Sequence, residues 1–172
     1  MSTALYIGRF QPFHLGHLDA IKQVLKKEKH LIIGVGSADD NYLPDNPFTS
    51  GERITMIKKA LDEAKIPPTK YMIMPVPNIN NYALWPKHVE LFLPKFNKVY
   101  SGSGIVENLF KNHSQIRVNM LQFNLKISAT DIRAAILNKK NLKDLVPYSV
   151  IKYLKEIKAL DRLIVTQNVI KR

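Results

Sequence analysis

The sequence predicts an α/β protein with a Rossmann-like, doubly wound parallel sheet of about five strands and helices on both faces. Two observations support this fold class. Short apolar runs of strand length alternate along the chain with segments whose apolar residues recur at helical spacing. Strands that alternate with helices favour a parallel sheet covered by helices. The length of 172 residues fits a single domain, 1–172, in which a helical C-terminal part begins near residue 128.

The expected strands are apolar runs that end in glycine, proline or polar residues. The first, TALYIG, is typical of a strand buried on both faces. The five expected strands are Thr3–Gly8, His30–Gly36, Tyr71–Val76, Lys98–Ser101 and Ile116–Asn119. In sheets of this kind, ligands bind at the carboxyl ends of the strands, where the strand order switches.

The expected helices are marked by apolar stripes and by capping residues at their starts. Thr49 and Glu52 are spaced as a capping box, and so are Ser128 and Asp131. The expected helices are Gly16–Lys27, one that starts after Thr49, a short one over Leu84–Phe92, one from Gly104 to about Asn112, Ile132–Leu137, and a last one from about Tyr148 to Leu160.

Composition excludes several classes of protein. The chain has no cysteine, which excludes disulfides, thiolate zinc sites and a cysteine nucleophile. No apolar run approaches the ~18 residues of a membrane helix, and the N-terminal residues lack the pattern of a signal peptide, so we expect a cytoplasmic protein without membrane contact. The net charge of +12, concentrated in residues 86–172, is compatible with a nucleic-acid-binding module, a lysine-rich solvated surface or a site for polyanionic small molecules.

The most informative segment is GRFQPFHLGH, residues 8–17. It follows the first expected strand and leads into a helix, whose amino end offers free N–H groups and a partial positive charge to a phosphate. His14 and His17 share one face of that helix and can donate hydrogen bonds to phosphoryl oxygens, while Gly16 has no side chain to hold a phosphate away. Two histidines without acidic or thiol ligands are a poor zinc signature, so we expect no resident metal site.

A second phosphate clamp is predicted at SATDIR, residues 128–133. Ser128 and Thr130 can cap a helix or donate to phosphate, and Arg133 can bind phosphate oxygens in a bidentate manner. The alternative is a capping box with a solvated arginine. Together with the two histidines, the segment favours a pair of clamps that face one phosphate chain.

These segments resemble the nucleotidyltransferase superfamily that is related to class I aminoacyl-tRNA synthetases. Four further segments extend the resemblance: GVGSA at 34–38, NPFTSGERITMI at 46–57, ALW at 83–85 and YSGS at 100–103. With them, the chain is similar over nearly its whole length to archaeal-type nicotinamide-nucleotide adenylyltransferases. The resemblance implies an ATP site at Gly8, Arg9, Phe10, His14, Gly16, His17, Gly102, Ser128, Thr130 and Arg133. It implies a nicotinamide mononucleotide (NMN) site at Phe48, Trp85 and Asn81, Mg²⁺ carried with ATP, and a homo-oligomer.

Three positions depart from the pattern of the family. Asn78 and Tyr82 stand where relatives often have an acidic residue and an asparagine, and Asn80 or Asn81 can supply the amide contact instead. Asp45 replaces a basic residue found in some relatives. One phosphate contact is therefore expected to be missing here or to be made by another residue. Arg53 is equally compatible with an ion pair and with a ligand contact.

The predicted reaction is adenylyl transfer, in which the NMN phosphate attacks the α-phosphorus of ATP in line and pyrophosphate leaves. Such reactions depend mainly on positioning and charge neutralisation, and the expected catalytic residues are His14, His17, Arg9 and Arg133. One alternative is adenylyl or cytidylyl transfer to another phosphorylated acceptor such as phosphopantetheine, which Trp85 and its ALW context argue against. The alternatives from other classes are a basic nucleic-acid-binding module without turnover, for which no RNA-binding or helix-turn-helix motif is present, and a regulator that binds ATP without turnover.

Overall fold

A computed structural model describes residues 3–122 and 124–168 of the chain. It contains a parallel sheet of five strands in the order β3-β2-β1-β4-β5, which confirms the predicted fold class. The strands are β1 (Thr3–Gly8), β2 (His30–Val35), β3 (Tyr71–Pro75), β4 (Lys98–Ser101) and β5 (Arg117–Met120). Each lies within one residue of its predicted bounds at both ends, because the buried apolar runs determine where a strand can form.

The central strand β1 contributes side chains to both faces of the sheet. Ala4 and Tyr6 belong to one buried cluster, and Leu5 and Ile7 belong to the other. This alternation is the period of two that a strand imposes. Pairing with β2 places Ile7 opposite Gly34, where a Cβ atom would lie 3.1 Å from Cγ1 of Ile7. The close approach of the two strands at this level therefore depends on a residue without a side chain.

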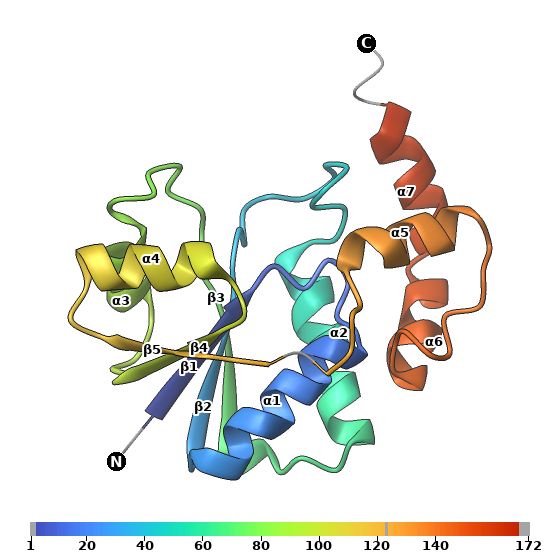
Figure 1. Ribbon diagram of the computed structural model, residues 1–172. Helices are drawn as coiled ribbons and strands as arrows, with labels where there is room; N and C mark the ends of the chain where they lie inside the picture. The colour runs from blue at the N-terminus through green and yellow to red at the C-terminus, as the bar shows by residue number, and fades with distance from the viewer. Residues whose placement is uncertain (1–2, 123, 169–172) are drawn as a thin grey trace.

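Helices cover both faces of the sheet (Figure 1). One face is packed by α1 and α2, with α5, α6 and α7 in the same apolar cluster, and the other by α3 and α4. Their bounds are α1 (Leu15–Lys27), α2 (Ser50–Glu63), α3 (Trp85–Phe92), α4 (Gly104–His113), α5 (Ala129–Leu137), α6 (Tyr148–Glu156) and α7 (Ala159–Asn168), with a 3₁₀ turn, η1, at Pro68–Lys70. In residues 3–122 and 124–168, no helix is both long and apolar enough to cross a membrane.

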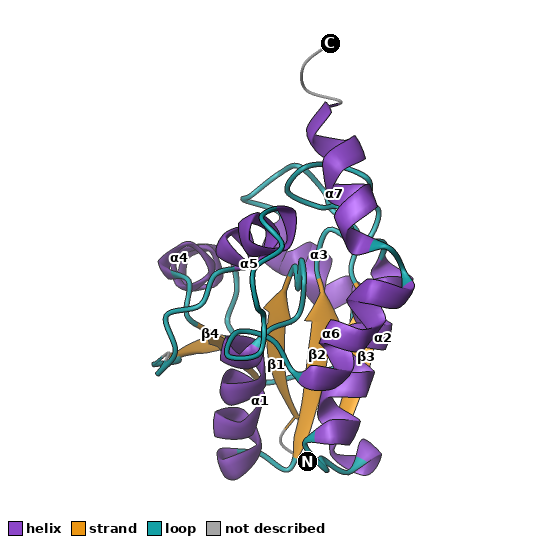
Figure 2. Cartoon of the chain, turned by 90° about the vertical axis from the view of Figure 1, so that its right-hand side faces the viewer, coloured by secondary structure: helices purple, strands orange, loops and turns teal. Residues whose placement is uncertain are grey.

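The prediction of one last helix from Tyr148 to Leu160 is wrong, because the chain turns between two helices there. α6 ends at Glu156, and α7 begins at Ala159. Between them, Lys158 has a φ of 51°, in the left-handed region that interrupts a right-handed helix. The break allows α7 to continue above the carboxyl ends of the strands (Figure 2).

The strand order switches between β1 and β4. From β1 the chain proceeds outward to β2 and β3, then returns to the other side of β1 to form β4 and β5. The register pairs Tyr6 with Tyr100, so the loops that begin at Gly8 and Gly102 leave neighbouring strands at the same level. This is the position at which doubly wound sheets bind ligands.

Candidate active site

His14 and His17 form the amino-terminal cap of α1. His14 is the N-cap residue, and its Nδ1 accepts a hydrogen bond from the backbone N–H of His17 at 3.3 Å. In return, Nδ1 of His17 accepts a hydrogen bond from the backbone N–H of His14 at 3.3 Å. The two rings stack with their centroids 3.5 Å apart. This reciprocal arrangement is a capping box built from imidazoles. It is possible because the two histidines are three residues apart, the spacing from which a shared face was predicted.

Burial defines the protonation state of both imidazoles, and the cap defines their tautomer. Burial lowers the pKa of His14 to about 4, and burial together with the charge of a protonated His14 lowers the pKa of His17 well below its ordinary value. Both rings are therefore neutral at pH 7. Because each Nδ1 accepts a backbone N–H, the ring proton of each histidine is assigned to Nε2. The pair thus offers two neutral N–H donors.

The residues around the histidines support the rings. Phe10, 1% exposed, packs edge-on against His17 with centroids 4.8 Å apart, so its side chain backs the imidazole and is not open to ATP. A Cβ atom on Gly16 would lie 3.1 Å from the His14 ring, and one on Gly8 would lie 3.2 Å from the Phe10 ring. The glycine at position 16 thus makes room for an imidazole, a reason that differs from the expected close approach of phosphate.

A cavity of about 520 Å³ lies in front of the two histidines. Its lining includes Tyr6, His14, His17, Lys126 and Ser128. Ser128 is the N-cap of α5, as expected: its hydroxyl accepts the N–H of Asp131 and donates to the Asp131 carboxylate at 2.6 Å. Lys126 was missed from the sequence, although it comes only two residues before the SATDIR segment.

Arg133 is buried and already engaged. Its Nη1 donates to the carbonyl of Gln11 at 3.0 Å, and its Nη2 donates to Asp45 at 2.8 Å and to the hydroxyl of Thr130 at 3.3 Å. Burial lowers the pKa of Arg133, the Asp45 carboxylate opposes this shift, and the charge of Arg9 adds to it. The predicted phosphate clamp therefore holds a carboxylate of the chain itself.

Arg53 is a structural ion in the core. Its side chain is fully buried and donates to the carbonyls of Arg9, Gly36, Ser37 and Thr49 at 2.7–3.2 Å. Burial lowers its pKa to about 10; Asp40 and Asp39 oppose the shift, and the nearby charge of Arg9 contributes to it. Arg53 thus joins the loops after β1 and β2 to the start of α2 through backbone carbonyls, and it is not an ion-paired surface residue.

A second cavity of about 520 Å³ is lined in part by Arg9, in the loop after β1. Its walls come from the loops after β1, β2 and β3 and from α3 and α4. The lining includes Arg9, Ser37, Asp40, Asn46, Asn78, Ile79, Asn80, Asn81, Tyr82, Trp85, Ile105, Val106 and Leu109. The half-buried Trp85 ring packs edge-on against Phe110 with centroids 5.7 Å apart, and Asn81 holds the preceding turn by accepting the N–H of Leu84.

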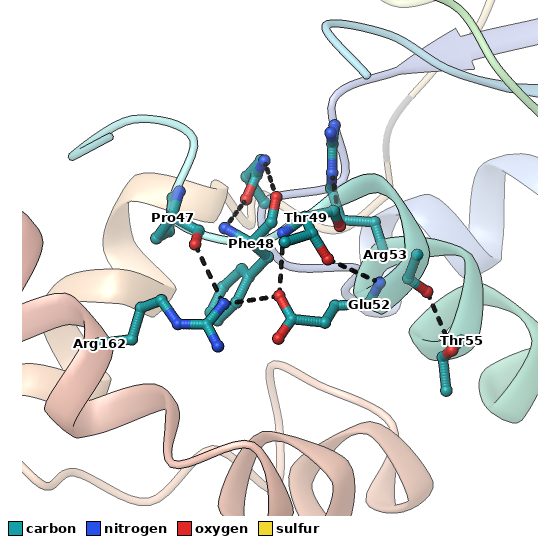
Figure 3. Close-up of polar contacts among 9 residues, drawn as sticks. Pro47, Phe48, Thr49, Glu52, Arg53, Thr55 and Arg162 are labelled. Carbon is teal, nitrogen blue, oxygen red and sulfur yellow. Dashed lines mark hydrogen bonds and ion pairs between the residues drawn. The ribbon is translucent and has the colours of Figure 1, made fainter. Parts of the chain in front are cut away.

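Phe48 is a core residue and does not line this cavity. Its ring is fully buried, and its backbone N–H and carbonyl are both held by the side-chain amide of Gln11 at 2.9 Å. The following turn is fixed as Figure 3 shows: Glu52 accepts hydrogen bonds from the backbone of Thr49 at 2.9 Å and from Arg162 of α7 at 2.7 Å. The structure therefore separates Phe48 from Trp85 and Asn81, with which the sequence had grouped it.

The remaining site residues follow the strand ends. Gly102 is exposed in the loop after β4, at the level of Gly8 in the loop after β1. The sequence did not single out three residues of the second cavity, Ser37, Asp40 and Asn46. Two of them lie in segments already noted for the family: Ser37 in GVGSA and Asn46 in NPFTSGERITMI. Among residues 3–122 and 124–168, no group of three or more histidines and carboxylates is placed to hold a metal ion.

Comparisons with known proteins show the family of the chain. Residues 5–135 match the cytidylyltransferase-like family. The nicotinamide-nucleotide adenylyltransferase of Thermococcus sibiricus is 41% identical over 160 residues, which cover 92% of this chain and 86% of that protein. That of Methanococcus aeolicus is 41% identical over 161 residues, covering 93% and 92%.

Solved structures show the same fold. A bifunctional NMN adenylyltransferase/ADP-ribose pyrophosphatase from Francisella tularensis superposes with a TM-score of 0.80 at 22% identity, over 99% of this chain and 54% of that protein, so this chain spans about half its length. The same protein has been solved with AMP and a manganese ion. The sequence motifs, the imidazole cap at the switch point and these relatives lead to one conclusion: the chain belongs to the nicotinamide-nucleotide adenylyltransferases of the cytidylyltransferase-like family.

Proposed function

We propose that the protein joins ATP and nicotinamide mononucleotide to give NAD⁺ and pyrophosphate. The observation that carries the proposal is a pair of cavities, each of about 520 Å³, whose linings both include residues of the segment 8–17. His14 and His17 line one cavity, and Arg9 lines the other. ATP in the first and NMN in the second would bring the α-phosphorus and the attacking phosphate together at this loop, as in-line transfer requires.

The two imidazoles supply donors to the phosphoryl oxygens. Because their Nδ1 atoms are held by backbone N–H groups, the Nε2–H groups are available to the phosphates. A neutral donor placed in advance stabilises charge that develops in the transition state without a cost of reorganisation. The amino end of α1 adds its partial positive charge at the same place. Ser128, Thr130 and Arg133 complete the ATP side, and Mg²⁺ arrives with ATP as part of the substrate.

The acceptor cavity is suited to a cationic aromatic base. Trp85 borders it together with several amide side chains, and the indole face attracts a pyridinium ring. Phosphopantetheine, the alternative acceptor, is a flexible chain without a ring to stack. For the nucleic-acid-binding alternative, the structure presents two separate cavities where a continuous basic groove would be expected.

The assay that tests the proposal is turnover of the purified protein with ATP, Mg²⁺ and a panel of acceptors: NMN, its deamidated form, phosphopantetheine and ribose 5-phosphate. We expect NAD⁺ from NMN at a kcat/KM at least tenfold above that for phosphopantetheine, and no requirement for a nucleic acid. His17→Ala is expected to lower kcat by roughly 100-fold or more with a much smaller change in KM, since it removes a donor used mainly in the transition state. An unchanged kcat would contradict the catalytic role.

Two further expectations accompany this function. A homo-oligomer follows from the resemblance to the family, and a monomer in light scattering at assay concentration would contradict it. A cytoplasmic location is the second expectation, to be tested by fractionation of the source cells.

A further inference from the structure

We propose that Asp45 is an internal competitor of ATP, whose carboxylate occupies the Nη2 position of Arg133 and leaves it when a phosphate of ATP binds there. The proposal rests on the function proposed above. It concerns how tightly ATP is held and assigns a role to a residue that departs from the family pattern.

The contact is an ion pair between segments 88 residues apart in the sequence. Nη2 of Arg133 lies 2.8 Å from Oδ1 of Asp45 and 3.3 Å from the hydroxyl of Thr130. A guanidinium nitrogen of this kind carries two protons, so both protons of Nη2 are committed. Nη1 donates one of its two protons to the carbonyl of Gln11. A phosphate oxygen can therefore reach Nη2 only by replacing one of its present acceptors.

Of these acceptors, Asp45 is the one that can leave. Its side chain is 76% exposed, whereas the side chain of Arg133 is 8% exposed. Asp45 lies in the loop between β2 and α2, which rises beside α5 and α7 at the carboxyl end of the sheet (Figure 1). Thr130, by contrast, is part of α5 itself, the helix that also carries Arg133. Replacing a carboxylate by a phosphate exchanges one anion for another and leaves the buried guanidinium paired.

The positive charge near Arg133 favours an anion beside its guanidinium group. Arg9, which lines the acceptor cavity, is close enough for its charge to lower the pKa of both Arg133 and Arg53. Arg9 thus repels both guanidinium groups, and nearby carboxylates offset this repulsion. At Arg133 this carboxylate is Asp45, whereas at Arg53 the carboxylates are Asp40 and Asp39.

The test is a double-mutant cycle on ATP binding, measured by calorimetry with MgATP and without acceptor. Asp45→Asn keeps the size of the side chain but removes its charge, and we expect it to tighten ATP binding by about 2- to 5-fold, the range for one partly exposed ion pair. Asp144→Asn makes the same change of net charge at an exposed loop position and is expected to change the Kd by less than about twofold. In an Arg133→Gln background, Asp45→Asn is expected to have almost no effect.

Two outcomes would overturn the proposal. One is a Kd for ATP in Asp45→Asn that is unchanged or weaker. The other is an equal gain with and without Arg133, which would mean that Asp45 only repels the triphosphate through space. Inorganic tripolyphosphate should repeat the gain seen with ATP, and adenosine should show none; a gain for adenosine would also contradict the mechanism.

The same experiment distinguishes this proposal from the proposed function. Because binding is measured without acceptor, the effect of Asp45 is read independently of turnover. Wild-type protein that makes NAD⁺ but shows no effect of Asp45→Asn refutes only the competitor role. Wild-type protein that makes no NAD⁺ from NMN but binds ATP more tightly after Asp45→Asn refutes only the proposed function.

Discussion

The imidazole cap of α1 makes the stability of the fold depend on pH in a defined window. In the folded protein the pKa of His14 is lowered to about 4, from an ordinary value of 6.5, and the pKa of His17 is lowered as well. Below pH 6.5 the unfolded chain takes up a proton at each histidine and the folded chain does not. Stability contributed by the neutral rings is therefore complete above pH 6.5 and is lost as the pH falls toward 4.

The magnitude follows from the size of the shift. A shift of one pKa unit corresponds to about 1.4 kcal/mol, so His14 alone accounts for about 3 kcal/mol of unfolding free energy between pH 6.5 and 4. The perturbation is His14→Asn, because asparagine keeps an N-cap acceptor and does not titrate. The assay is urea unfolding, without nucleotide and at constant ionic strength, at half-unit steps from pH 4 to 8.

The expected result is a difference between the curves of unfolding free energy against pH for wild type and His14→Asn. Titration of the carboxylates affects both curves equally and cancels in the difference. The unfolding free energy of wild type should fall more steeply below pH 6.5 than that of His14→Asn, and the gap should approach about 3 kcal/mol at pH 4. His113→Asn, which removes an exposed imidazole at the end of α4, should run parallel to wild type. Parallel curves for wild type and His14→Asn would refute the reasoning that the cap holds a neutral ring.

Three more predictions follow from the same contacts. Gly16→Ala places a Cβ atom 3.1 Å from the His14 ring and should lower kcat by tenfold or more, to the extent that the ring is displaced; full activity would contradict the fit. Arg53→Gln leaves buried carbonyls without donors and should lower the unfolding free energy by roughly 3 kcal/mol or more, whereas the exposed Arg117→Gln should change it little. Trp85→Ala should raise the KM for NMN and leave the KM for ATP within about twofold, with Trp85→Phe intermediate; an equal rise for both substrates would place the ring elsewhere.

Most of the fold could be predicted because local patterns determine it. The buried runs at 3–8 and 30–35 form strands, and the Thr49–Glu52 capping box starts α2 at the expected residue. The break at Lys158 could not be predicted, since nothing in the residue types there indicates a left-handed φ. The apolar pattern of a single helix continues through Lys158, so the position of the break depends on tertiary packing.

The sequence draws attention to several residues of the candidate site, but it does not show the contacts that they make. The spacing of His14 and His17 identified them, yet no sequence pattern showed that each ring caps the backbone of the other. The ion pair of Arg133 with Asp45 joins distant segments and leaves no local signal. Arg53 had a signal that could have been used: it precedes the buried Ile57 by four residues and so lies on the buried face of α2. Phe48 was assigned by resemblance, and its apolar character fits the core equally well.

The central claim is that this chain transfers the adenylyl group of ATP to the phosphate of NMN, and the fate of the α-phosphate tests it most directly. Purified protein is incubated with Mg²⁺, NMN and ATP labelled at the α-phosphorus, and the products are separated by chromatography. We expect the label to appear in NAD⁺ and unlabelled pyrophosphate to form in equal amount. Label recovered as AMP, or left in ATP while NMN is unconsumed, would contradict it.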